Sequence, residues 1–179
     1  MTEQELKACL PFATEANIKK FLIPINNTFL QFEINNSKRQ AAFLAQIAHE
    51  SGSLRYVEEI ASGEAYEGRK DLGNTQPGDG VRFKGRGLIQ ITGRANYKQL
   101  SKDLNYDFVS KPEDLELPGA AAMSAGWFWN KKKLNSYADQ DNFKRITQLI
   151  NGGLNGFDDR VKHWHRCLKA LGVKEINLI

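Results

Sequence analysis

The sequence predicts a single, mainly α-helical domain with a small β element. Most of the chain carries apolar residues at helical spacing, in segments bounded by capping residues, proline or glycine. Only two short segments, residues 81–84 and 88–92, alternate apolar and polar residues as strands do. A length of 179 residues suits one domain, or one domain divided into two lobes by a cleft. We therefore expect helices packed around a shared core, with two short strands beside them.

The first predicted helices have clear boundary signals. Thr2 and Glu5 form a capping box that opens a short helix. Two further helices are expected on either side of Pro24, because proline inside a helix removes a hydrogen bond and disfavours helical angles in the residue before it. Residues 1–36 contain no readable chemistry, and we interpret them as an N-terminal helical packing segment.

The next helix, over residues 37–50, carries the first candidate catalytic residue. Ser37 and Gln40 predict a capping box at its start, and a continuous apolar face follows. Glu50 stands at the end of this buried helix, directly before the break at Ser51-Gly52-Ser53. A carboxylate there is held rigidly and faces a gap, which is the position expected of a general acid.

Glu59 is the candidate partner of Glu50. It follows nine residues later, and in one straight helix that separation would place it about 180° away. The Ser51-Gly52-Ser53 break supplies the turn that a shared site requires, because glycine reaches backbone angles that other residues avoid. Two glutamates facing each other across a cleft are the arrangement that glycoside hydrolysis uses. The alternative interpretation is a pair of exposed surface glutamates.

Polar residues after residue 60 could complete such a site. Residues 61–87 are rich in glycine and lack a helical period, which predicts a long ordered loop that helps to build the site. Within the predicted strand 88–92, Gln90 and Thr92 share the face opposite the isoleucines. They could hold a sugar hydroxyl or orient a water, or could instead form a solvated strand face.

Helices account for most of the remaining chain. We expect the aromatic run Trp127-Phe128-Trp129 to lie in the core, with the alternative that one tryptophan borders the cleft and stacks on a sugar. One predicted helix follows the second strand and ends at Leu104. Three more are predicted over residues 120–129, 143–150 and 158–171.

Composition excludes several function classes. Three histidines without an HExxH or CxxC pattern argue against zinc, and no Walker or GxSxG motif is present, so we expect no metal and no cofactor. No apolar segment is long enough to span a bilayer, and the first residues lack signal-peptide character, so we expect cytoplasmic synthesis. In a reducing compartment Cys9 and Cys167 are expected as free buried thiols. The net charge of +4 and pI near 9.0 suit a polyanionic partner such as nucleic acid, an anionic membrane or a bacterial cell wall.

Four motifs in order resemble one known family. They are His49-Glu50-Ser51-Gly52, the glutamate at position 59, the run from Gly85 to Tyr97, and Ile150-Asn151-Gly152-Gly153. Together they resemble glycoside hydrolase family 19, which includes chitinases and the lysozyme-like endolysins of bacteriophages. The resemblance covers roughly residues 38–165 and implies a lysozyme-like helical fold whose two lobes flank a central substrate cleft.

The resemblance also implies catalytic roles. In this family's inverting mechanism Glu50 matches the general acid, Glu59 matches the general base, and Thr92 stands where a Ser or Thr holds the attacking water. Nearby acidic residues leave the base open to three alternatives: Glu58, Glu64 and Glu67. The candidate substrate-binding residues are His49, Arg86, Gln90, Asn96, Tyr97 and Asn151, of which Gln90, Asn96 and Asn151 match sugar-contacting positions of the family.

We interpret the whole of residues 1–179 as one catalytic domain that hydrolyses β-1,4 bonds in peptidoglycan glycan strands. A chitinase acting on N-acetylglucosamine polymers is the alternative within the same chemistry, and an inactive sugar-binding protein on this scaffold is the third hypothesis. The expected protein is a monomer that neither binds nucleic acid nor inserts stably into a membrane. It would reach the cell wall after release by a separate membrane-permeabilising protein.

Overall fold

The computed structural model describes residues 1–174, and within them the fold is mainly α-helical. The predicted domain also includes residues 175–179, which lie outside the described residues. The α-helices are α1 (Glu3–Cys9), α2 (Glu15–Gln31), α3 (Ser37–Glu50), α4 (Asp79–Arg82), α5 (Arg94–Leu104), α6 (Pro118–Lys131), α7 (Leu134–Asp139), α8 (Phe143–Asn151) and α9 (Phe157–Ala170). Three short 3-10 helices are η1 (Glu64–Tyr66), η2 (Lys70–Leu72) and η3 (Pro112–Glu116).

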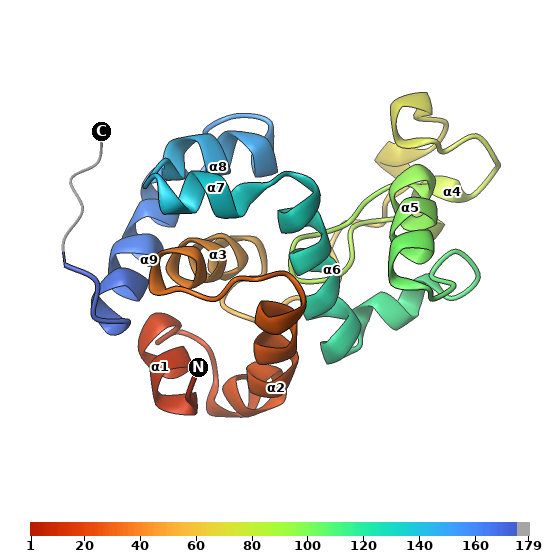
Figure 1. Ribbon diagram of the computed structural model, residues 1–179. Coiled ribbons are helices and arrows are strands. Elements are labelled where there is room, and N and C mark those ends of the chain that lie inside the picture. The colour runs from red at the N-terminus through yellow and green to blue at the C-terminus, as the bar shows by residue number, and fades with distance from the viewer. Residues whose placement is uncertain (175–179) are drawn as a thin grey trace.

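Helix α3 is the centre of the larger part of the molecule (Figure 1). Each residue from Ala41 to Ala48 is buried, as expected for a helix that is covered on all sides. Helix α9 packs along α3, and α1 and α7 also contact it. Helices α4 and α5, the loops around them and η3 form a smaller part on the far side of α6 (Figure 1). The carboxyl end of α3 is therefore held firmly by its surroundings.

The expected break at Pro24 is wrong, because α2 continues through this residue. Ile18, Phe21 and Ile25 are buried on both sides of the proline, and they hold one continuous apolar face against the core. The Thr28 hydroxyl donates to the Pro24 carbonyl at 2.9 Å. Packing of this face outweighs the roughly 3 kcal/mol that a proline costs inside a helix.

The start of α3 also differs from the prediction by one residue. Asn36, not Ser37, is the N-cap, and its side chain accepts a hydrogen bond from the Arg39 amide. Gln40 does not close a capping box but donates to the Ile34 carbonyl at 3.1 Å. The helix is still capped by a short polar side chain, as the sequence around this boundary indicated.

Neither predicted strand forms. Residues 79–82 make the short helix α4, and residues 88–92 make a tight turn in which Gln90 adopts a positive φ of 60°. Ile91 pairs back onto Arg86 through two backbone hydrogen bonds of 2.8 and 3.1 Å. In residues 1–174 the β element is thus reduced to two isolated antiparallel bridges, Glu58 to Arg86 and Arg86 to Ile91.

The helices predicted for the later part of the chain are confirmed. Residues 120–129, 143–150 and 158–171 fall largely within α6, α8 and α9, and Gly152 ends α8 with a left-handed φ of 74°. Cys9 and Cys167 are free and buried. None of the helices in residues 1–174 combines the length and hydrophobicity needed to cross a bilayer.

Candidate active site

Glu50 is anchored at the end of α3 by a buried arginine. Arg160 of α9 places Nη2 2.6 Å from Glu50 Oε1, and the arginine side chain is only 2% exposed. Its Nη1 donates to Gln46 Oε1 at 2.6 Å, one turn earlier on α3. Within residues 1–174 no hydrogen bond or ion pair reaches Glu50 Oε2. This second oxygen is therefore the one able to exchange a proton with a substrate.

His49 is held by the residue next to Arg160. Its Nδ1 lies 2.7 Å from Asp159 Oδ2, and the hydrogen bond with His49 holds the pKa of the Asp159 carboxyl below its ordinary value. Gly156, at the start of α9, lets the backbone approach the His49 ring closely, because a β-carbon at this position would lie 2.3 Å from the ring. Consecutive residues of α9 thus fix consecutive residues of α3. His49 is used in this contact and does not line the pocket described below.

Glu59 has one satisfied and one unsatisfied carboxylate oxygen. The Tyr66 hydroxyl donates to Oε2 at 2.9 Å, and burial together with this bond raises the pKa of Tyr66. Oε1 is buried and has no hydrogen-bond partner within residues 1–174. A buried carboxylate oxygen normally has a donor, so Oε1 is suited to accept a hydrogen bond from a water or substrate hydroxyl.

The alternative bases are engaged elsewhere or exposed. Glu58 pairs with Lys84 at 2.7 Å and lies 3.6 Å from Arg86. Glu67 accepts from the backbone amides of Gly78 and Gly80, at 2.7 and 2.8 Å, and so supports the loop. Glu64 is exposed on η1. Of these carboxylates, Glu59 alone combines partial burial with a buried oxygen that no group in residues 1–174 satisfies.

Gly85 links Glu59 to Gln90. A β-carbon at this glycine would lie 2.9 Å from both Glu59 Oε2 and Gln90 Oε1. The Gly85 carbonyl also accepts from the Glu59 amide at 2.9 Å. The glycine backbone therefore lets the two side-chain ends approach the same space.

A pocket of about 690 Å³ lies beside Gln90, between the two parts of the molecule. One wall comes from η2, the turn at 89–92 and α5, and the other comes from α6 and α8. Four predicted polar residues line it: Gln90, Thr92, Asn96 and Asn151. The apolar and charged residues around them are Asp71, Leu72, Ile89, Ile91, Trp127, Phe128, Lys131, Lys132, Leu149, Ile150 and Gly152.

Two of the polar residues that line this pocket, Thr92 and Asn96, are hydrogen-bonded to backbone carbonyls of the turn at 89–92. The Thr92 hydroxyl donates to the Gln90 carbonyl at 3.0 Å and keeps its lone pairs as acceptors. Asn96 donates from Nδ2 to the Thr92 carbonyl at 2.8 Å. Asn151 Nδ2 is buried without a partner in residues 1–174, so it is an available donor in the pocket wall.

Two predicted substrate-binding residues lie beneath the site instead. Tyr97 is fully buried, its hydroxyl donates to the Lys84 carbonyl at 2.8 Å, and burial raises its pKa to about 12. Arg86 is 8% exposed and pairs with Glu116 at 2.8 Å. Neither lines the pocket, so their assignment as substrate contacts is corrected to support of the loop.

The α9 residue that holds Glu50, Arg160, was not among the residues predicted from the sequence. One signal was present: Arg160 lies at helical spacing with His163, Trp164 and Cys167, which are all buried. A charged residue on such an apolar face requires a buried partner. Tyr66 lies in the predicted ordered loop at 61–87, but nothing in the sequence spacing shows which carboxylate it meets.

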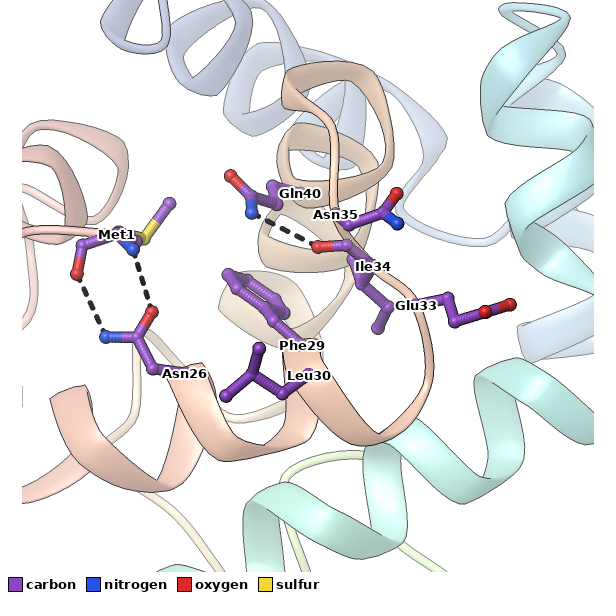
Figure 2. A pocket seen from close by; sticks show the side chains of 8 residues that line it. All are labelled: Met1, Asn26, Phe29, Leu30, Glu33, Ile34, Asn35 and Gln40. Carbon is purple, nitrogen blue, oxygen red and sulfur yellow. Dashed lines mark hydrogen bonds between the residues drawn. The ribbon is translucent and has the colours of Figure 1, made fainter.

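A second pocket, of about 620 Å³, lies at the N-terminal side (Figure 2). Its polar groups mainly hold the chain, since Asn26 exchanges two hydrogen bonds of 2.9 Å with Met1 and Gln40 donates to Ile34. Glu33 is the single carboxylate that lines it. The pocket beside Gln90 also has one lining carboxylate, Asp71, and Glu50 and Glu59 line neither of these two pockets. Residues 1–174 contain no cluster of His, Cys, Asp or Glu able to hold a metal ion.

Comparison with known proteins identifies the family. No protein-family model matches the chain. A glycosyl hydrolase family 19 domain-containing protein of Haemophilus influenzae is 34% identical over 162 residues, which cover 71% of this chain and 77% of the relative. The chain belongs to glycosyl hydrolase family 19. An endochitinase of Arabidopsis thaliana is 37% identical over 163 residues, covering 87% of this chain and 56% of the relative. The chain spans about half the length of the plant chitinases that it matches.

Solved structures show the same fold. Chitinase C from Streptomyces griseus superposes with a TM-score of 0.78 at 22% identity, covering 97% of this chain and 77% of the other. A bacterial family 19 chitinase gives a TM-score of 0.76 at 22% identity, covering 99% and 97%. The predicted lysozyme-like helical fold is thereby confirmed, and this family 19 member is a glycoside hydrolase.

Proposed function

We propose that this glycoside hydrolase cleaves β-1,4 bonds in polymers of N-acetylglucosamine, as a chitinase does. The observation that carries the proposal is the pair Glu50 and Glu59, each anchored through one oxygen with the other not engaged by protein groups. The relatives support the substrate, because several are named endochitinases. They favour chitin over peptidoglycan, which was the first expectation from the sequence.

The roles follow from the free oxygens. Glu50 Oε2 would protonate the glycosidic oxygen while Arg160 keeps Oε1 in place. Glu59 Oε1 would take a proton from the attacking water, and the lone pairs of the Thr92 hydroxyl would orient that water. Attack from the face opposite the leaving group inverts the anomeric centre.

Substrate binding would use both walls of the pocket. The Asn151 Nδ2 donor would be available to an acceptor oxygen of the glycan. Trp127 and Phe128 contribute apolar side chains to the α6 wall, and a lysine ammonium lies over each ring. Because the pocket lies beside Gln90 and Gln90 lies beside Glu59, a glycan in the pocket would reach the catalytic base.

The test is hydrolysis of a soluble neutral chitin derivative and of peptidoglycan sacculi by the purified protein. We expect new reducing ends from chitin, an inverted product anomer by NMR, and loss of roughly 10³-fold or more in kcat for Glu50→Gln or Glu59→Gln. Both variants should retain binding to the oligosaccharide. Cleavage of sacculi alone would restore the peptidoglycan hypothesis, and no cleavage of either polymer would favour an inactive sugar-binding protein.

A further inference from the structure

The end of α6 places two lysines in the wall of the substrate pocket. Lys131 is the last residue of the helix and Lys132 is its C-cap, and both line the pocket. The run Lys131-Lys132-Lys133, read from the sequence alone, favours a solvated face. In the structure, two of these three lysines share the pocket wall with Trp127 and Phe128. Their charges therefore belong to the surface that a glycan would contact.

Aromatic rings hold both ammonium groups against this wall. Lys131 Nζ lies 4.7 Å from the centre of the Trp127 ring, and Lys132 Nζ lies 5.7 Å from the centre of the Phe128 ring. Both distances are within the range of a cation–π interaction. Neither lysine forms an ion pair among the described residues, 1–174. The two charges are positioned without being neutralised by a salt bridge.

The acidic side chains nearby have other partners. Asp71, on the opposite wall, is hydrogen-bonded to Arg69, and this contact holds the pKa of Asp71 below its ordinary value. Asp103 accepts from Trp127 Nε1 at 2.7 Å and from Gln99. The Asp103 carboxylate also attracts Lys131, but Asp103 does not line the pocket. The α6–α8 wall itself therefore carries two positive charges and no carboxylate, which favours an anionic group beside it.

The adjoining end of α8 contributes a neutral hydrogen-bond donor, which, like the lysines, favours an acceptor group on the ligand. Asn151 Nδ2 is buried in this wall and has no partner in the described residues. Two ammonium groups and one amide N–H favour an acceptor with negative charge. A free amino group on the sugar would instead meet donors and like charges.

We propose that the α6–α8 wall, made of Lys131, Lys132 and Asn151, is a subsite for carboxylate groups carried by the glycan. The enzyme would then prefer amino-sugar polymers with acidic substituents over neutral ones with the same backbone. This inference rests on the proposed function, because it concerns the same pocket.

The experiment compares glycol chitin, which is neutral, with carboxymethyl chitin, which carries carboxylates on the same backbone. We expect the wild-type protein to show the higher kcat/KM on the acidic polymer, with the preference declining as salt rises. In a Lys131→Gln/Lys132→Gln double variant the ratio of the two kcat/KM values should fall on the order of tenfold, mainly through KM. The Lys131→Arg/Lys132→Arg variant keeps both charges and should keep the preference.

The control removes an equal charge far from the pocket. Lys19 and Lys20 are a neighbouring pair on α2, exposed and outside the pocket, so Lys19→Gln/Lys20→Gln should leave the ratio unchanged. An equal loss on both polymers, or an unchanged ratio in the pocket variant, would overturn the subsite. A wild-type protein that cleaves neither polymer would contradict the proposed function instead, so the two failures are distinguishable.

Discussion

At the scale of single residues, Gly85 is a position where a substitution should reduce activity while changing stability little. A β-carbon here would lie 2.9 Å from Glu59 Oε2 and from Gln90 Oε1, both of which are ends of flexible side chains. Gly85→Ala should therefore displace the Glu59 carboxylate, the proposed base, while the backbone stays in place. We expect kcat/KM to fall roughly 10- to 100-fold, with the free energy of unfolding changed by no more than about 1 kcal/mol.

Gly119→Ala is the matched control for this variant. A β-carbon at Gly119 has no neighbour within 4 Å, and the residue does not have a positive φ. Activity and stability should both be close to wild type. Full activity of Gly85→Ala on the neutral chitin polymer would show that Glu59 is not confined by this glycine.

Candidate catalytic residues could be proposed from the sequence more readily than the residues that hold them. Glu50 and Glu59 could be proposed from their positions around a helix break, because a break in the chain is visible in sequence. The ion pair of Glu50 with Arg160 joins positions far apart in the chain, and no local pattern states which carboxylate the arginine meets. Tyr97 was misassigned for the same reason, since its burial depends on distant packing.

At the scale of elements, the ion pair of Asp79 with Arg94 ties the loop at 61–87 to α5. The Asp79 side chain is 1% exposed, and its two oxygens meet Arg94 Nη2 at 2.5 Å and Nε at 2.8 Å. The hydrogen bond from Arg94 holds the pKa of Asp79 below its ordinary value of 3.8. This contribution to stability is therefore present above pH 3.8 and is lost as the pH falls through the lower, folded-state pKa.

Asp79→Asn should cost about 3 kcal/mol of unfolding free energy at pH 7, since it leaves Arg94 without its partner. Denaturant titrations at pH 7 and at pH 3 measure the difference between the variant and wild type, which should shrink at the lower pH. Asp71→Asn, in the exposed pair with Arg69, should change stability little. A difference for Asp79→Asn that is the same at both pH values would contradict the ion-pair account.

The elements themselves show where sequence patterns were insufficient. Alternation over residues 88–92 correctly indicated that Ile89 and Ile91 are buried, at 8% and 4% exposure. A tight turn with Gln90 at positive φ satisfies the same alternation without a partner strand. Pro24 failed as a boundary because the buried face of α2 extends past it. In both places tertiary packing decided what the local pattern left open.

At the scale of the whole molecule, both parts share one hydrophobic core. Phe83, Leu100 and Leu115 of the smaller part belong to the same buried cluster as Leu6 and Leu168 of the larger part. Helix α6 contacts both α2 and η3, and so joins the two parts. Mainly helical content could be predicted from periodicity, whereas this sharing of a core could not, because it depends on contacts between distant segments.

A shared core predicts that the chain unfolds in one cooperative step. The three tryptophans lie on α6 and α9, so their fluorescence reports the larger part and the junction, whereas far-UV circular dichroism reports all helices. Thermal unfolding followed by the two signals should give coincident curves with one midpoint. If the smaller part had an independent core, dichroism would show a further transition, from α5 and its neighbours, that tryptophan fluorescence does not register. Such a second step would divide the predicted single domain into two folding units and would place the substrate pocket at their boundary.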